Sequence, residues 1–184
     1  GASVPFKYKG ANQTEMITAT NDRTFAGASN WTDQDLASGG GSYDESGDLS
    51  ITSGASGDYC YLANANIGFV AGKSYRVTVT ASSLSGTSFN LIVGGTAQSI
   101  GVILNGTNSY EFTMGAGFNT LKTLLVQSSG TGGITLDDFS VVPIGAVAEY
   151  DGSGITNTKW YDKSGNELHG TVSGATDENT AGAP

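Results

Sequence analysis

Short apolar runs recur from Thr20 to Val142, separated by segments rich in glycine, asparagine and serine. Residues 75–80 show the pattern most clearly, because Tyr75, Val77 and Val79 occupy every second position, with polar residues between them. A period of two predicts strands with one buried face. The predicted strands are residues 49–52, 59–62, 75–80, 89–93, 100–104, 110–114, 121–127 and 134–142.

The spacing of these runs predicts the fold class. Successive runs start roughly 10–15 residues apart, and the pairs Asn105-Gly106 and Gly132-Gly133 predict turns between them. About eight or nine antiparallel strands at this spacing are typical of two packed sheets. We therefore expect an all-β fold, an antiparallel β-sandwich or jelly roll.

The two ends of the chain differ from this middle part. Residues 1–19 have no clear period, which predicts an irregular N-terminal arm. Residues 144–184 contain the second tryptophan and the only histidine, and end in a tail rich in threonine, glycine and alanine. So short a segment seldom forms an independent β domain. We expect a sandwich over residues 20–143, followed by a C-terminal extension or the start of another module.

Composition and charge exclude several function classes. With 28 glycines and only 14% charged residues among 184, a helical bundle is disfavoured, and the apolar runs argue against disorder. Eight basic residues, all isolated in the sequence, stand against 17 acidic ones, so nucleic acid and anionic membranes are poor partners. No apolar run approaches the roughly 20 residues of a membrane span. Cys60 is alone, which excludes an internal disulfide.

Catalytic devices are weakly represented, and we expect no enzyme. His169 is the only histidine, and no G-x-S-x-G motif accompanies it. Paired carboxylates could serve a glycosidase, but those present lie in predicted turns or at a strand end, where solvent or a cation explains them better. The pairs are Asp33/Asp35, Asp44/Glu45 and Asp137/Asp138.

Calcium is the one cofactor that the sequence favours. Hard cations bind several carboxylate and carbonyl oxygens, and Asp137 follows an apolar strand start, where its carboxylate needs solvent or a partner. Residues 162–167 place oxygen-bearing side chains at alternate positions, like the start of a calcium loop, but lack its glycine. The alternative for both places is that these side chains cap turns.

Tyrosines offer a second kind of site. Tyr59 and Tyr61 share one face of a strand whose other face carries Cys60 and Leu62, and one of these faces must point outward. Flat aromatic rings with a few polar groups suit the apolar and hydroxyl surfaces of a sugar. The residues that we expect around this pair are Tyr43, Arg76, Asn90 and Gln98. The alternative is that the tyrosines pack under loops; Trp31 is expected in the core.

Three stretches in order form a series: Phe25 followed by Trp31, then residues 71–79 (AGKSYRVTV), then residues 134–141 (ITLDDFSV). This series resembles the carbohydrate-binding jelly rolls grouped as families four, nine and twenty-two. The resemblance covers residues 20–142 and implies a sandwich that binds polysaccharide. It also implies a structural calcium between the first strand and the closing strand, with Asn21 and Asp137 as its ligands; residues 21–26 read NDRTFA where the family has Asn-Gly-x-Phe-Glu.

The flanks suggest a setting. Residues 8–15 (YKGANQTE) and 159–171 resemble stretches in phage and prophage tail or fibre proteins, where small jelly rolls lie between stalk segments. This resemblance implies a virion tail fibre or appendage, and otherwise an extracellular location. Because fibre proteins are often trimeric, the flanks are where we expect contacts in a homotrimer or with other virion proteins.

These observations combine into one expected function and two alternatives. We expect a non-catalytic adhesion module that binds a cell-surface glycan. The alternatives are a structural spacer or decoration domain of the virion without a small ligand, and an accessory carbohydrate-binding module of a secreted glycoside hydrolase. The net charge of -9 disfavours strongly anionic polysaccharides unless calcium bridges them.

Overall fold

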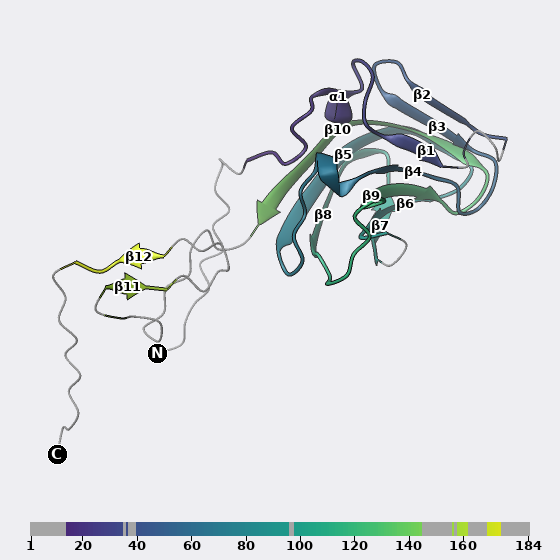
Figure 1. Cartoon of the computed structure of the whole chain (residues 1–184). Helices are drawn as coiled ribbons and strands as arrows, with labels where there is room; N and C mark the ends of the chain where they lie inside the picture. The colour runs from purple at the N-terminus through teal and green to yellow at the C-terminus, as the bar shows by residue number, and fades with distance from the viewer. Residues whose placement is uncertain are drawn as a thin grey trace. The chain divides into compact units, whose positions relative to one another are not determined.

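The computed structural model describes residues 14–34, 36, 40–95, 98–144, 156, 158–161 and 169–173 (Figure 1). The chain divides into two units. One spans Asn12–Pro143, and the other combines Gly1–Ala11 with Ile144–Pro184. The first unit contains the predicted sandwich.

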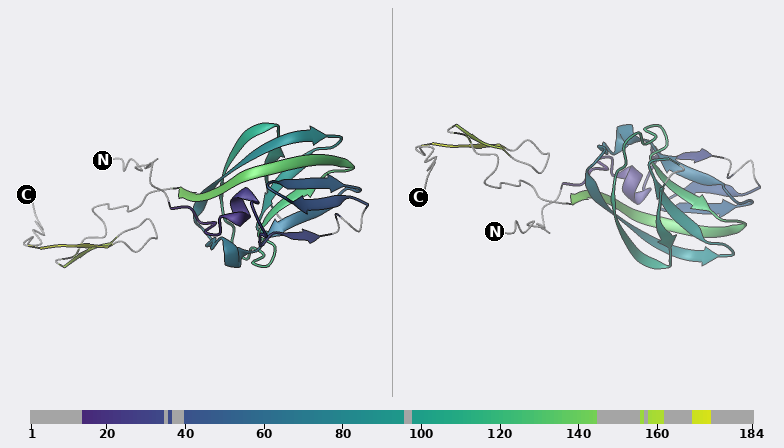
Figure 2. Two further views of the ribbon diagram at one scale, coloured as in Figure 1. Left: turned by 90° about the horizontal axis from the view of Figure 1, so that it is seen from above. Right: turned by 90° about the horizontal axis from the view of Figure 1, so that it is seen from below.

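Two five-stranded antiparallel sheets form the first unit (Figures 1 and 2). Sheet A has the order β1 (Thr32–Gln34), β4 (Tyr59–Leu62), β9 (Leu124–Ser128), β6 (Phe89–Val93) and β7 (Gln98–Ile103). Sheet B has the order β2 (Ser42–Glu45), β3 (Leu49–Ser53), β10 (Gly132–Ile144), β5 (Ser74–Ser85) and β8 (Gly106–Thr113). The chain passes repeatedly from one sheet to the other, and the predicted all-β sandwich is confirmed.

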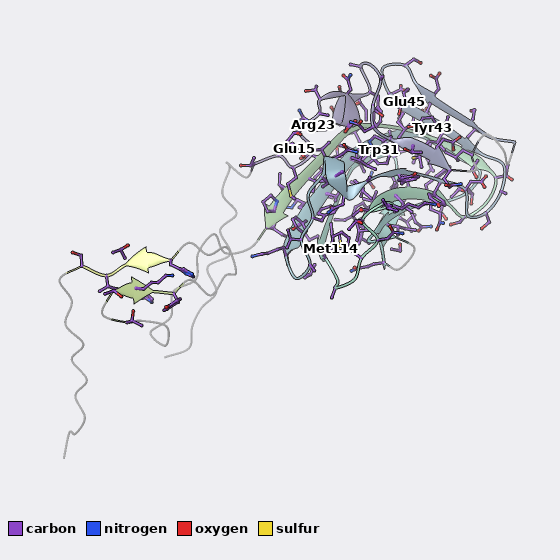
Figure 3. All side chains as sticks on the ribbon, viewed as in Figure 1. Glu15, Arg23, Trp31, Tyr43, Glu45 and Met114 are labelled. Carbon is purple, nitrogen blue, oxygen red and sulfur yellow. The ribbon has the colours of Figure 1, made fainter. Side chains whose placement is uncertain are left out.

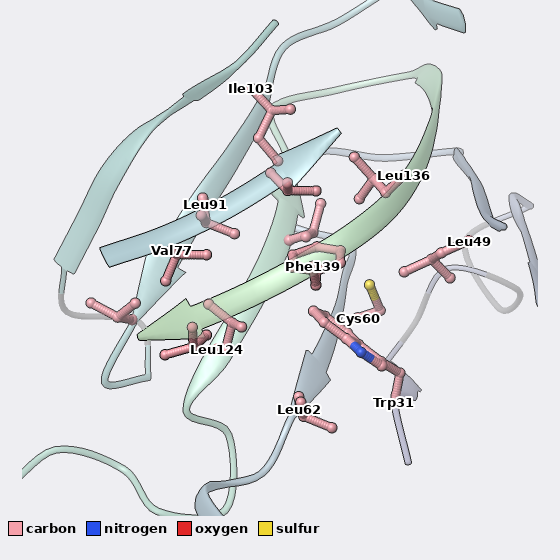
Figure 4. Packing of buried hydrophobic residues seen from close by; sticks show 14 of the residues in the cluster. Trp31, Leu49, Cys60, Leu62, Val77, Leu91, Ile103, Leu124, Leu136 and Phe139 are labelled. Atoms are coloured by element: carbon pink, nitrogen blue, oxygen red, sulfur yellow. The ribbon is translucent and has the colours of Figure 1, made fainter. Parts of the chain in front are cut away.

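The core lies between the sheets and follows the predicted alternation. In β5, Tyr75, Val77 and Val79 are buried, while the polar residues between them keep partial exposure. Figure 4 shows the packing around Trp31 and Phe139, whose ring centroids are 4.8 Å apart. Side chains from both sheets enter this cluster, among them Leu49, Cys60, Leu62, Val77, Leu91, Ile103, Leu124 and Leu136. Trp31 is therefore a core residue, as its sequence position predicts.

Some short elements differ from the sequence prediction. Four short elements are not predicted by the sequence, because each is too short to show a period. They are the strands β1 and β2, the helix α1 (Asn21–Thr24) and the 3-10 turn η1 (Asn64–Asn66). The prediction of a turn at Gly132-Gly133 is wrong, since both residues lie in β10. A Cβ atom at Gly132 would lie 2.3 Å from the Ser85 carbonyl oxygen, so glycine there permits a close approach of two backbone segments.

The last residues of the predicted N-terminal arm belong to the sandwich. Ile17 is fully buried, and the Met16 amide donates to the Val141 carbonyl at 2.9 Å. The Glu15 carboxylate (labelled in Figure 3) accepts the Ser140 hydroxyl at 2.5 Å and the Val141 amide at 2.9 Å. The compact unit therefore starts at Asn12 rather than at residue 20.

In the second unit, β11 (Lys159–Trp160) pairs with β12 (Gly170–Thr171). The Tyr161 and His169 rings meet edge to face, with centroids 5.1 Å apart. Of the predicted calcium segment 162–167, no residue lies within the described part of the chain. None of the helices described in either unit is long and apolar enough to cross a membrane.

One contact between the sheets gives a stability prediction. The Tyr110 ring of β8 lies against Gly101 of β7, and a Cβ atom at Gly101 would be 2.1 Å from its Cε1 atom. We expect Gly101→Ala to lower the free energy of unfolding by about 1–3 kcal/mol through overpacking, measured by urea denaturation. Gly115→Ala, where the added Cβ meets nothing within 4 Å, is the control and should leave the midpoint unchanged. Equal midpoints for both variants would contradict the contact.

Candidate functional site

Tyr59 and Tyr61 lie on the outer face of sheet A, opposite the core-facing Cys60 and Leu62. Both tyrosines are half-buried, and their ring centroids are 6.1 Å apart. Strand register places two rows of side chains across this face. The first row is Gln34, Tyr59, Gln127, Asn90 and Val102; the second is Thr32, Tyr61, Leu125, Ile92 and Ser99. We call these ten positions the tyrosine face.

Two apolar side chains form the middle of the second row. Leu125 and Ile92 are only 1% and 5% exposed, although they point away from the core. A neighbouring loop explains part of this burial. Thr123 continues the outward positions of β9, and its hydroxyl donates to the backbone carbonyl of Asn119 at 2.7 Å. The backbone amide of Asn119 in turn donates to the Gly94 carbonyl. The loop before β9 therefore closes one end of the tyrosine face.

The same loop places a cation at the tyrosine pair. The Lys122 ammonium donates to the Tyr59 hydroxyl oxygen at 2.6 Å and to the Gln34 amide oxygen at 3.2 Å. It lies 5.1 Å from the Tyr59 ring centroid and 5.5 Å from that of Tyr61. The ammonium is much closer to the Tyr59 oxygen than to the ring centre, so it lies beyond the hydroxyl end of the ring. It therefore covers neither face of the Tyr59 ring.

Two amides in the first row have fixed orientations. The Gln127 amide nitrogen donates to the Gly57 carbonyl at 3.3 Å, and the Asn90 amide nitrogen donates to the Ser129 hydroxyl at 3.0 Å. Within the described residues, neither amide oxygen accepts a hydrogen bond. Each side chain can therefore offer its carbonyl oxygen as an acceptor to a hydroxyl group that approaches the face.

Of the six residues predicted around an aromatic site, the structure brings three together: Tyr59, Tyr61 and Asn90. Tyr43 and Arg76 belong to sheet B. The Tyr43 phenol donates to the Glu45 carboxylate (both labelled in Figure 3). Burial raises the pKa of Tyr43, and the hydrogen bond to Glu45 raises it further. Arg76 pairs with Glu111 at 2.6 Å. Gln98 lies at the end of β7 opposite the core-facing Val93, so its position is not on the tyrosine face.

Each predicted calcium ligand makes a hydrogen bond with a backbone group. The Asp137 carboxylate accepts the Asp138 amide at 2.8 Å, and the Asn21 amide nitrogen donates to the Ala28 carbonyl at 3.2 Å. No group of three or more His, Cys, Asp or Glu side chains that could hold a metal occurs in the described ranges. Near Asn21, the fully buried Asp22 is instead bonded by Asn30, whose backbone amide donates to it at 2.6 Å.

The lone thiol is not placed for nucleophilic chemistry. Cys60 is fully buried in the core cluster, and desolvation raises the pKa of its thiol. The thiolate needed for attack is therefore disfavoured at neutral pH. Its position facing the core follows from the same alternation that turns Tyr59 and Tyr61 outward.

Several residues of the site were missed by sequence reasoning. They are Gln34, Ile92, Lys122, Leu125 and Gln127. The alternation in residues 123–127 could have indicated Leu125 and Gln127, because Leu124 and Val126 are the core-facing partners of that strand. Lys122 and Gln34 have no such signal, since their contact with Tyr59 depends on how β1, β4 and the loop before β9 meet.

Comparison with known proteins gives similar structures only. No protein-family model matches the chain, and no curated protein matches it. The family 22 xylan-binding domain of Xyn10C from Paenibacillus barcinonensis is 13% identical, with a TM-score of 0.45, covering 73% of this chain and 97% of that domain. The C-terminal family 22 module of Xyn10B from Clostridium thermocellum is 19% identical, with a TM-score of 0.43, covering 68% and 94%.

A third similar structure is described as "BiXyn10A CBM1 APO"; it is 14% identical with a TM-score of 0.46, covering 65% of this chain and 94% of that chain. The similar structures named here are thus carbohydrate-binding modules. With TM-scores and identities this low, the function of the chain has to be inferred from its own residues.

Proposed function

We propose that the chain is a non-catalytic module that binds a glycan on the tyrosine face. The observation that supports this most strongly is the pairing of Tyr59 with Tyr61, 6.1 Å apart, on a face whose ten positions carry no charged residue. Partly exposed aromatic rings beside amide groups suit sugar rings and their hydroxyls.

The geometry of the first row indicates how such a glycan would lie. The row crosses all five strands of sheet A, and four steps between neighbouring strands span about 19 Å. Gln34, Gln127 and Asn90 supply amides along this line, with Tyr59 between two of them. A glycan chain several sugars long would therefore run across the strands, with its hydroxyls over the amides.

A glycan-array screen of the full chain tests this proposal, followed by calorimetric titration with xylohexaose, cellohexaose and the strongest array binder. The first two are probes, chosen because a similar structure is named a xylan-binding domain and because both are uncharged. We expect saturable binding of at least one oligosaccharide. Silence across the array from a folded protein would contradict glycan binding and favour the alternative of a structural spacer.

We keep the virion setting as part of this proposal. It is supported by the resemblance of residues 8–15 and 159–171 to stretches in tail and fibre proteins. Most residues of these two stretches lie outside the described part of the chain. Light scattering on the full-length protein tests the expected trimer, and a strict monomer would remove it. The other setting is that of an accessory module of a secreted glycoside hydrolase, which would require a catalytic domain encoded in the same gene.

Calcium binding by Asp137 and Asn21 stays a prediction with its own test. A ligand present at 100 times its dissociation constant stabilises the folded state by about 2.7 kcal/mol. If calcium is a structural ligand, thermal unfolding should therefore shift to higher temperature in calcium than in chelator. Asp137→Asn should abolish that shift. Superimposable melting curves in calcium and chelator would remove the metal from the proposal.

A further inference from the structure

The Tyr59 hydroxyl has a defined role in the hydrogen bonds around it. An ammonium group is a donor only, so in the 2.6 Å contact between Lys122 and Tyr59 the phenol oxygen accepts. The hydrogen of that phenol must then point elsewhere. No oxygen of the described residues accepts it. The phenol hydrogen of Tyr59 is therefore available to a ligand.

The position of Lys122 is fixed by its loop rather than by the tyrosines alone. The backbone amides of Leu121 and Lys122 both donate to the Asn119 side-chain oxygen, at 2.9 Å and 3.2 Å. The Asn64 amide, just after β4, donates to the Thr120 carbonyl at 2.9 Å. These bonds hold the loop at the Leu62 end of β4, and the Lys122 side chain extends from there to the Tyr59 hydroxyl at the start of the strand.

We propose that Tyr59 and Lys122 act as one coupled unit that determines specificity on the tyrosine face. Lys122 fixes the phenol oxygen as an acceptor, and the phenol hydrogen then donates to an acceptor oxygen of the bound glycan. Accepting a bond from a cation polarises a hydroxyl and strengthens it as a donor. Lys122 is thus a positioning residue that acts through Tyr59. This inference rests on the proposed glycan binding and adds to it the ligand group that is recognised, an acceptor oxygen of the glycan.

The arrangement also explains why the ammonium does not block the site. Its nitrogen lies 2.6 Å from the phenol oxygen but 5.1 Å from the ring centroid, so it approaches along the edge of the ring. A sugar ring can stack on the Tyr59 face while one of its oxygens lies at the hydroxyl end, next to Lys122. The ligand class selected is therefore a glycan with an acceptor oxygen at the rim of a stacked sugar.

A double-mutant cycle tests the coupling. The dissociation constants of xylohexaose, cellohexaose and the strongest array binder are measured for the full-length wild type, Tyr59→Phe, Lys122→Met and the double variant. Tyr59→Phe keeps the ring and removes only the hydroxyl. We expect each single substitution to weaken binding about threefold to tenfold, the range for one hydrogen bond. The double variant should be no weaker than the worse single variant, and Lys122→Arg should restore part of the loss.

The second unit offers a matched control, because Lys159 lies 4.9 Å from the ring centroid of Tyr161 there. Tyr161→Phe and Lys159→Met should leave the dissociation constants unchanged. Binding that Tyr61→Ala removes but Tyr59→Phe and Lys122→Met leave intact would overturn the coupled unit and keep the proposed function. Additive losses in the double variant would also overturn it. Failure of the wild type to bind any of the three oligosaccharides would contradict both proposals.

Discussion

Trp31→Ala is expected to lower the free energy of unfolding by about 3–5 kcal/mol, the range for removing a large buried aromatic side chain. The indole is 5% exposed, and its ring lies 4.8 Å from Phe139 and 6.1 Å from Phe25, centroid to centroid. Its ring nitrogen donates to the Asp22 main-chain oxygen at 2.9 Å. The substitution therefore leaves a cavity between the sheets and removes the indole donor from the Asp22 carbonyl in α1. Domains of this size are stable by only about 5–15 kcal/mol, so the loss is a large fraction of the total.

Urea denaturation followed by circular dichroism measures this loss, because fluorescence would itself change with the number of tryptophans. Trp160→Ala is the control: Trp160 is 37% exposed, and its removal should change the free energy by no more than about 0.5 kcal/mol. Trp31→Phe keeps part of the aromatic packing and removes the indole N–H, so its loss should lie between zero and that of Trp31→Ala. A midpoint for Trp31→Ala equal to that of the wild type would show that Trp31 is not a core residue.

The fold was predictable wherever a strand is long enough to show its period. In β5, the alternation of Tyr75, Val77 and Val79 with polar residues indicates both the strand and its buried face. β1 and β2 have three and four residues, and in such short strands the pattern cannot be distinguished from chance. The glycines at 132 and 133 were misread because glycine also occurs where two backbones approach closely.

The candidate site was predictable only in part, for a related reason. The spacing of Tyr59 and Tyr61 shows that they share a strand face, since this depends on the period alone. Whether Arg76 joins them depends on which sheet β5 enters, and sheet membership is decided by strand order, which a single sequence does not display. Lys122 is more remote still, because its contact with Tyr59 joins residues 63 positions apart through a loop.

Tyr61→Ala is expected to weaken glycan binding by at least about thirtyfold, the loss that corresponds to roughly 2 kcal/mol at a central contact residue. Tyr61 is paired with Leu125, which is followed by Ile92 in the second row, so the Tyr61 ring borders the apolar middle of the tyrosine face. Removing it takes away the stacking surface while leaving the core-facing Cys60 and Leu62 in place. The fold should therefore persist, with an unfolding midpoint close to that of the wild type.

Titration of Tyr61→Ala with the strongest array binder measures this effect. Tyr161→Ala is the control, because Tyr161 is 43% exposed and lies outside the tyrosine face, so its removal tests the loss of an exposed tyrosine as such. We expect its dissociation constant to equal that of the wild type. Equal affinities for Tyr61→Ala and the wild type, with both proteins folded, would place the binding site elsewhere on the molecule.

The geometry of the first row gives a second criterion. A glycan that crosses the strands contacts Asn90 as well, so Asn90→Ala should weaken the binding of long oligosaccharides more than that of short ones. Tyr61→Ala should weaken the binding of both.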